Sequence, residues 1–132
     1  MNTIKIEIPS MIENIRIIES FIDNAKERFE LNDDIYGNIM IAVTESVSNA
    51  IKHGNKSDKG KSVNLSLTLK DDVIKFVIED EGKGFDYNTL PDPTAPENLE
   101  KTGGRGIFLM KNLADEVTFQ KDGRVVELSF YL

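Results

Sequence analysis

The stretch TESVSNAIKHGN, Thr44–Asn55, places Glu45, Asn49 and Lys52 along one stripe of a predicted helix. At 100° per residue, side chains four and seven positions apart return to nearly the same side of a helix. The neighbouring side of this helix is apolar and consists of Ile35, Ile39, Val43, Val47 and Ala50. A polar stripe beside a core-facing side is usually a solvated face, and the alternative is a binding site.

Length and composition limit what such a site could serve. The chain of 132 residues is the size of one ordinary domain and can bury a core without disulfides or structural metal. Its net charge of -7 argues against non-specific binding to nucleic acid or anionic lipid, so proteins or small molecules are the expected partners. It has no cysteine, which excludes thiolate catalysis. With no apolar run of membrane-spanning length and a strand-like N-terminus, we expect a cytoplasmic protein.

The apolar patterns predict the order strand, helix, helix, two strands, irregular stretch, helix, two strands. The second helix is expected to begin near Asn32 or Asp33 and to end at Gly54. Asp122 and Gly123 predict a two-residue hairpin turn between the last two strands. Because most strands are sequence neighbours, this order predicts an α+β fold, a two-layer α/β sandwich with a largely antiparallel sheet and its helices on one face.

The first predicted helix carries more apolar residues than one sheet contact needs. Ser10 and Glu13 match a capping box at its start. An apolar stripe from Met11 to Phe29 is most simply core. The apolar residues off this stripe are Ile12, Ile17 and Phe21. This surplus is compatible with a protein partner.

A carboxylate belongs to the buried side of the strand VIKFVIED, Val73–Asp80. By period two, Asp80 shares the side of Ile74, Phe76 and Ile78, where an unpaired charge is costly. Asp80 therefore needs a partner, although it could merely cap a turn. The glycines that follow, Gly82 and Gly84, allow the backbone to approach another group closely.

An irregular stretch then runs to a glycine cluster. Its length and its prolines favour a functional lid over about 85–103. It ends in KTGGRG, 101–106, directly before an apolar helical pattern. Free backbone amides at a helix start form a phosphate cradle.

The helix stripe, the strand-end aspartate, the two-glycine turn and the glycine loop together resemble the GHKL superfamily, which includes DNA gyrase, histidine kinases and mismatch-repair ATPases. The short form E-x-x-x-N-A-x-x-H-G, Glu45–Gly54, is similar to that of the bacterial anti-sigma-factor serine/threonine kinases. The resemblance spans nearly the whole chain and implies one ATP-binding domain of the Bergerat fold over 1–132. Three motifs in the family's order and spacing are a specific signal.

The resemblance implies a nucleotide site. Asn49 would hold the Mg²⁺ that bridges the ATP phosphates, and Lys52 would face them. Asp80 would accept a hydrogen bond from the adenine amino group. The remaining candidate nucleotide contacts are Gly82, Gly84, Gly103, Gly104 and Gly106. Arg105, between the last two, is a further candidate phosphate contact that matches no role in the family.

The resemblance also implies a kinase. Glu45 would activate the attacking hydroxyl, and Arg16 aligns with a partner-contacting arginine of these kinases. The expected function is to sequester a sigma factor and to phosphorylate a serine or threonine of an anti-anti-sigma protein, with homodimers possible. The alternatives are a non-catalytic ATP-dependent interaction module and a detached histidine-kinase catalytic domain. His53, the only histidine, is more simply a helix cap.

Overall fold

The computed structural model describes residues 2–82 and 104–132. The strands are β1 Asn2–Pro9, β2 Ser62–Lys70, β3 Val73–Glu79, β4 Glu116–Gln120 and β5 Val125–Tyr131. The helices are α1 Ile15–Arg28, α2 Asp33–Asn49 and α3 Gly104–Leu113, with a 3-10 turn Ile12–Asn14 before α1 and a π-helical turn Ala50–Gly54 after α2. Over these residues, the predicted order of strands and helices is confirmed.

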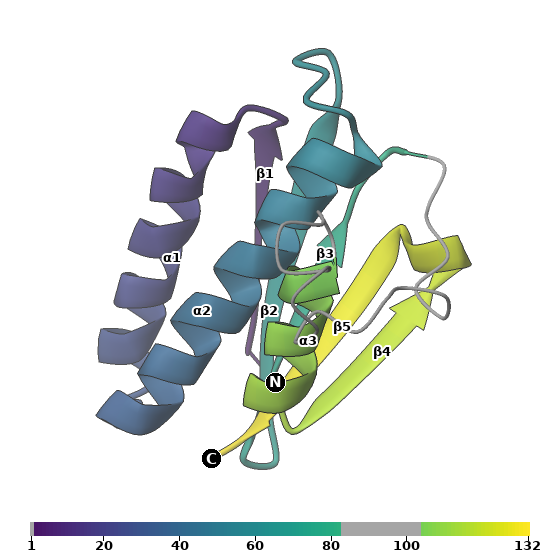
Figure 1. Cartoon of the computed structure of the whole chain (residues 1–132). Helices are drawn as coiled ribbons and strands as arrows, with labels where there is room; N and C mark the ends of the chain where they lie inside the picture. Colours follow the sequence, from purple (N-terminus) through teal and green to yellow (C-terminus); the bar gives the residue numbers. More distant parts are fainter. Residues whose placement is uncertain (1, 83–103) are drawn as a thin grey trace.

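The five strands form one sheet in the order β1-β2-β3-β5-β4, and every neighbouring pair is antiparallel. The described helices lie on one face of this sheet, with α2 between α1 and α3 (Figure 1). The predicted two-layer α+β fold is therefore confirmed. Among the described residues, no helix is both long and apolar enough to cross a membrane.

Alternating strand residues and the apolar side of α2 make the core between the two layers. Leu67 pairs with Phe76 and Phe76 with Leu128, and all three are fully buried. Ile39 and Val43 of α2 are fully buried above them. Each buried side chain of this size stabilises the fold by about 1.5–3 kcal/mol, so the register that the alternation predicts is strongly specified.

The predicted capping box at the start of the first helix is wrong. Ser10 is buried, and its hydroxyl accepts a hydrogen bond of 2.6 Å from Asn55 Nδ2. Asn14 instead donates from Nδ2 to the carbonyl of Pro9 at 2.9 Å, and α1 begins only at Ile15. A tertiary contact therefore occupies the hydroxyl that the local pattern assigns to a cap.

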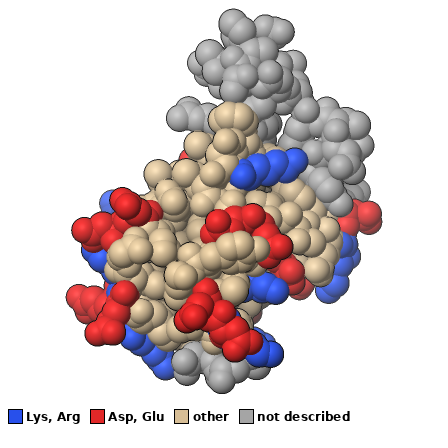
Figure 2. Space-filling view, turned by 90° about the horizontal axis from the view of Figure 1, so that it is seen from below, with Lys and Arg blue, Asp and Glu red and all other residues tan. Residues whose placement is uncertain are grey.

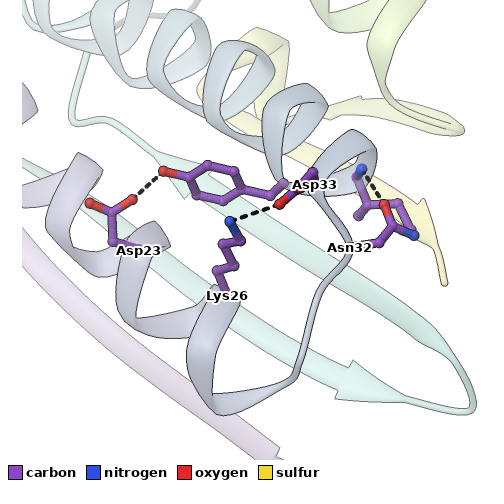
Figure 3. Close-up of polar contacts among 6 residues, drawn as sticks. Asp23, Lys26, Asn32 and Asp33 are labelled. Atoms are coloured by element: carbon purple, nitrogen blue, oxygen red, sulfur yellow. Dashed lines mark hydrogen bonds and ion pairs between the residues drawn. The ribbon is translucent and has the colours of Figure 1, made fainter.

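Polar side chains join α1 to the start of α2 (Figure 3). Asn32 caps α2 as expected, because its Oδ1 accepts from the backbone N–H of Ile35 at 2.8 Å. Lys26 pairs with Asp33 at 2.9 Å, and the hydroxyl of Tyr36 donates to Asp23. These contacts hold the two helices side by side at one end of the molecule.

The hairpin between β4 and β5 is longer than predicted. Residues 121–124 connect the two strands, with a 3-10 turn at Lys121–Gly123. The φ angles of Lys121, Asp122 and Gly123 are 50°, 58° and 88°, so three successive residues take left-handed backbone. The two-residue turn is therefore wrong, and the longer connection brings the carbonyl of Arg124 within 3.0 Å of the backbone N of Asp80.

Charged side chains of both signs are interspersed on the face seen from below in Figure 2. Over the described residues of that face, acidic and basic groups alternate rather than forming one basic surface. Together with the net charge of -7, this agrees with the expectation of protein or small-molecule partners.

Candidate functional site

The second helix widens at the end that carries the polar stripe. After Asn49 the chain forms a π-helical turn, in which the backbone N–H of Asn55 donates to the carbonyl of Ala50 at 2.8 Å. Lys52 lies in this turn and is exposed, whereas Asn49 is half-buried. Turns of this kind are rare and frequently occur at functional sites.

Residues from distant parts of the chain line one cavity beside this turn. Asn49 of α2 lies on its wall together with Asp80, which directly follows β3. Ser46, one turn earlier on α2, lies on the same wall. The other lining residues are Ala50, Ile78, Ile107, Met110, Gly123, Arg124 and Val126. The structure thus brings together two of the residues that the sequence singles out, Asn49 and Asp80.

Two buried polar atoms at this cavity lack hydrogen-bond partners within the described part of the chain. They are Ser46 Oγ and Asn49 Nδ2. Nearly all buried polar groups in proteins are paired, and an unpaired one costs about 1–3 kcal/mol. The donor set therefore fits a polar ligand. Ser46 was missed in the sequence, where its only signal is the three-residue spacing from Asn49.

Asp80 is held firmly although it lies outside the strand. It is 6% exposed, its backbone N–H donates to the carbonyl of Arg124, and its Oδ1 accepts from the backbone N–H of Gly82 at 2.8 Å. Burial raises the pKa of Asp80, while the hydrogen bond from Gly82 and the charge of Arg124 act in the opposite direction. A carboxylate in this setting gains from an additional donor, such as an amino group of a ligand.

Two glycines allow the helix end and the strand end to touch. A Cβ at Gly54 would lie 2.3 Å from Asp80 Oδ2, and a Cβ at Gly82 would lie 1.9 Å from the carbonyl oxygen of Gly54. A side chain at position 82 would overlap backbone, and one at position 54 would displace the carboxylate of Asp80. The close approach predicted for Gly82 is to the backbone of Gly54, a residue whose sequence signal indicated only a helix end.

The remaining candidates are placed as follows. Glu45 is half-buried on α2 and Arg16 is exposed on α1, and neither lines the cavity. Gly104, Arg105 and Gly106 begin α3, so a helix does start in the glycine cluster. Gly84, Gly103 and the predicted lid over 85–103 lie outside the described residues.

His53 is half-buried in the π-helical turn and does not line the cavity. Burial lowers the pKa of His53, and the charges of Lys56 and Lys52 lower it further. The described residues contain no cluster of three or more His, Asp or Glu that could hold a metal ion. A metal at this site would therefore need ligand oxygens in addition to Asn49.

Comparisons with known proteins agree with this geometry. A family model described as a histidine kinase-like ATPase domain matches residues 8–130. Serine-protein kinases RsbW from Staphylococcus aureus strains JH9 and Newman are each 32% identical over 137 residues, which cover 98% of this chain and 86% of the relative. The crystal structure of the RsbU and RsbW domains of Rv1364c from Mycobacterium tuberculosis matches with a TM-score of 0.70 at 18% identity. The match covers 100% of this chain but 33% of that longer one, and shows the fold alone.

The chain belongs to the histidine kinase-like ATPase domain family. Within this family, the resemblance to the anti-sigma-factor serine/threonine kinases that the motifs indicate is confirmed by the identity to the RsbW kinases.

Proposed function

We propose that this protein is a bacterial regulator that binds ATP with Mg²⁺, sequesters a sigma factor and phosphorylates a serine or threonine of an anti-anti-sigma antagonist. One observation carries the proposal: Ser46 and Asn49 place unpartnered buried polar atoms at the cavity that Asp80 also lines. The 32% identity to a serine-protein kinase supports the choice of substrate class.

In the proposed site, Asp80 accepts a hydrogen bond from the adenine amino group and the backbone at Gly82 lies against the base. Asn49 contributes its side-chain oxygen to Mg²⁺, which prefers oxygen ligands and keeps several waters. When bound there, Mg²⁺ would supply positive charge against the phosphates. The residues that would surround the phosphates are Lys52, Gly84, Gly103, Gly104, Arg105 and Gly106, with 85–103 as a lid.

The start of α3 suits a phosphate. Its first backbone N–H groups have no partner inside the helix, and the helix dipole adds positive potential at this end. Ile107 and Met110 of the same helix line the cavity with Asn49. The phosphates would therefore lie between the N-terminus of α3 and the amide of Asn49.

Glu45 is the proposed general base. It is half-buried and lies on α2 four residues before Asn49, so both side chains emerge on the same side of the helix. Its carboxylate would take the proton of the attacking serine or threonine hydroxyl as that oxygen bonds to the γ-phosphorus, while the bond from the γ-phosphorus to the oxygen of the β-phosphate breaks and ADP leaves. Removing such a base typically slows a reaction by about 10²- to 10⁴-fold.

The start of α1 is the proposed partner surface. Met11, Ile12 and Ile17 are large apolar residues that are 37%, 42% and 44% exposed, and Arg16 is exposed beside them. Exposed apolar residues that gather at one place are typical of protein contacts. We place the protein in the bacterial cytoplasm, where a sigma factor is found, and regard a homodimer as compatible with this surface.

The test is transfer of radiolabel from γ-labelled ATP to a purified anti-anti-sigma protein. Wild type should label a serine or threonine, and Glu45→Ala should lose transfer while it still binds ATP. Glu7→Ala, at an exposed position on β1, is the matched control and should transfer normally. ATP binding without transfer would favour the non-catalytic module, and an acid-labile product would favour a histidine-kinase domain.

A further inference from the structure

Asn55 is a fully buried polar residue directly after the π-helical turn. Its side-chain amide makes three hydrogen bonds. Nδ2 donates to Ser10 Oγ at 2.6 Å and to the carbonyl of Ser62 at 2.9 Å, and Oδ1 accepts from the backbone N–H of Glu81 at 2.7 Å. One side chain thus joins the end of α2 to the end of β1, the start of β2 and the segment that follows β3.

The orientation of this amide is determined by its partners. The carbonyl of Ser62 can only accept and the backbone N–H of Glu81 can only donate. Exchanging the oxygen and nitrogen of Asn55 would place its oxygen against the carbonyl of Ser62 and its NH₂ group against the backbone N–H of Glu81, and neither pair could form a hydrogen bond. The bond to Glu81 therefore has one geometry, and it fixes the backbone next to Asp80.

Three consecutive residues, of which Asp80 lines the cavity, each donate a backbone hydrogen bond here. The backbone N–H of Asp80 donates to Arg124, that of Glu81 to Asn55, and that of Gly82 to the side chain of Asp80. We propose that Asn55 is a positioning residue for base recognition: it holds the segment Asp80–Gly82 against Gly54 so that the Asp80 carboxylate meets the base edge. Asn55 acts through this segment and does not itself line the cavity. The inference rests on the proposed binding of ATP at Asp80.

A positioning role for Asn55 predicts that its substitution changes nucleotide selectivity, whereas a merely structural role predicts a change in stability alone. The experiment measures the Kd of fluorescent N-methylanthraniloyl ATP and GTP for three variants, together with their thermal midpoints. Asn55→Ala removes the bond to Glu81 and should lower the preference for the adenine nucleotide by about tenfold, the worth of one such bond. Ser10→Ala removes a bond of the same amide on the side away from Asp80. It should lower the thermal midpoint while the preference stays within about twofold of wild type.

The conservative variant Asn55→Asp keeps an oxygen acceptor for Glu81 and loses the donor to Ser62. It should recover most of the adenine preference in spite of a lower thermal midpoint. Equal nucleotide selectivity in wild type and Asn55→Ala would overturn the inference. A loss of selectivity in Ser10→Ala as large as that in Asn55→Ala would also overturn it. If Asn55→Ala does not fold, loss of selectivity in a folded Asn55→Asp overturns it, and amide exchange in wild type gives a second test.

In wild type, saturating ATP should slow hydrogen exchange at the Glu81 amide by about tenfold, because ligand contact at Asp80 stabilises the same segment. Unchanged exchange at Glu81 with ATP bound would contradict the positioning role. Failure of wild type to bind either nucleotide would instead refute the proposed function, so the two failures are distinguishable.

Discussion

Gly54 and Asp80 are in direct contact, since a Cβ at position 54 would lie 2.3 Å from Asp80 Oδ2. The π-helical turn after α2 and the end of β3 are therefore packed together. The hydrogen bond between Asn55 and Glu81, which are 26 residues apart in the sequence, also joins them. The candidate site depends on how these two ends meet.

Gly54→Ala should separate the two ends. The added methyl group overlaps the carboxylate of Asp80, and overpacking of this kind typically lowers the free energy of unfolding by about 1–3 kcal/mol. Gly37→Ala is the matched control, because nothing lies within 4 Å of a Cβ at this position inside α2. It should raise stability by about 0.5–1 kcal/mol. Urea denaturation checks both, and a fully stable Gly54→Ala would contradict the contact.

Asp80→Asn should stabilise the fold at neutral pH. Burial raises the pKa of Asp80 above its ordinary value of 3.8, so the folded protein binds this proton more tightly than the unfolded chain. The ionised carboxylate therefore lowers stability above its folded-state pKa, and this cost disappears below about pH 3.8. At pH 7 the thermal midpoint of Asp80→Asn should be higher than that of wild type, and the difference between the two midpoints should shrink toward acid pH. A less stable variant at pH 7 would show that the charge is compensated.

Ser46→Ala should stabilise the fold and weaken the binding of ATP. Ser46 Oγ is buried with no partner among the described residues, and removing an unsatisfied hydroxyl restores about 1 kcal/mol or more of unfolding free energy. If the nucleotide supplies the missing partner, the Kd for ATP should rise severalfold in the same variant. Chemical denaturation and a nucleotide titration measure the two effects. Lower stability would mean that this hydroxyl is already satisfied.

Asp23→Asn should change the titration of Tyr36. The hydrogen bond that Tyr36 donates to Asp23 is the largest cause of its raised pKa, followed by burial and by the charges of Asp23 and Glu19. The folded state binds this proton more tightly, so the contact stabilises the protein below pH 10.0 and its contribution is lost as the pH rises through the folded-state pKa.

Titration of the Tyr36 ring by NMR should show a lower pKa in Asp23→Asn than in wild type. Asp34→Asn changes an exposed carboxylate that is not a cause of the shift, and it should leave the pKa of Tyr36 where it is. An unchanged pKa in Asp23→Asn would mean that the two helices are not joined by this pair.

Periodicity was enough to predict the layers of this fold. Strict alternation in β2 assigned its apolar side chains to the helix-covered face, and a period of two in β3 assigned Ile74, Phe76, Ile78 and Asp80 to the same face. The acidic residues near Asp33 marked the start of α2, and Gly54 marked the end of the helical segment, whose last turn is π-helical and not α-helical. These features are local, so a pattern within one element suffices to predict them.

Features that depend on contacts between distant elements could not be predicted. The spacing of Ser10 and Glu13 predicts a helix cap, but the hydroxyl of Ser10 instead accepts a hydrogen bond from Asn55, 45 positions away. The π-helical turn and the role of Asn55 have no periodic signal. The hairpin after β4 reads as a short turn because left-handed backbone at Lys121 is unusual for lysine.

Calorimetric titration of ATP with Mg²⁺ tests most directly whether Asn49 and Asp80 belong to one nucleotide site. Wild type should bind one nucleotide per chain. Asp80→Asn and Asn49→Ala should each weaken binding by about tenfold or more, since each loses a hydrogen bond or ligand contact to a charged or polar group. Absence of binding in wild type, or equal affinity in all three proteins, would contradict the account.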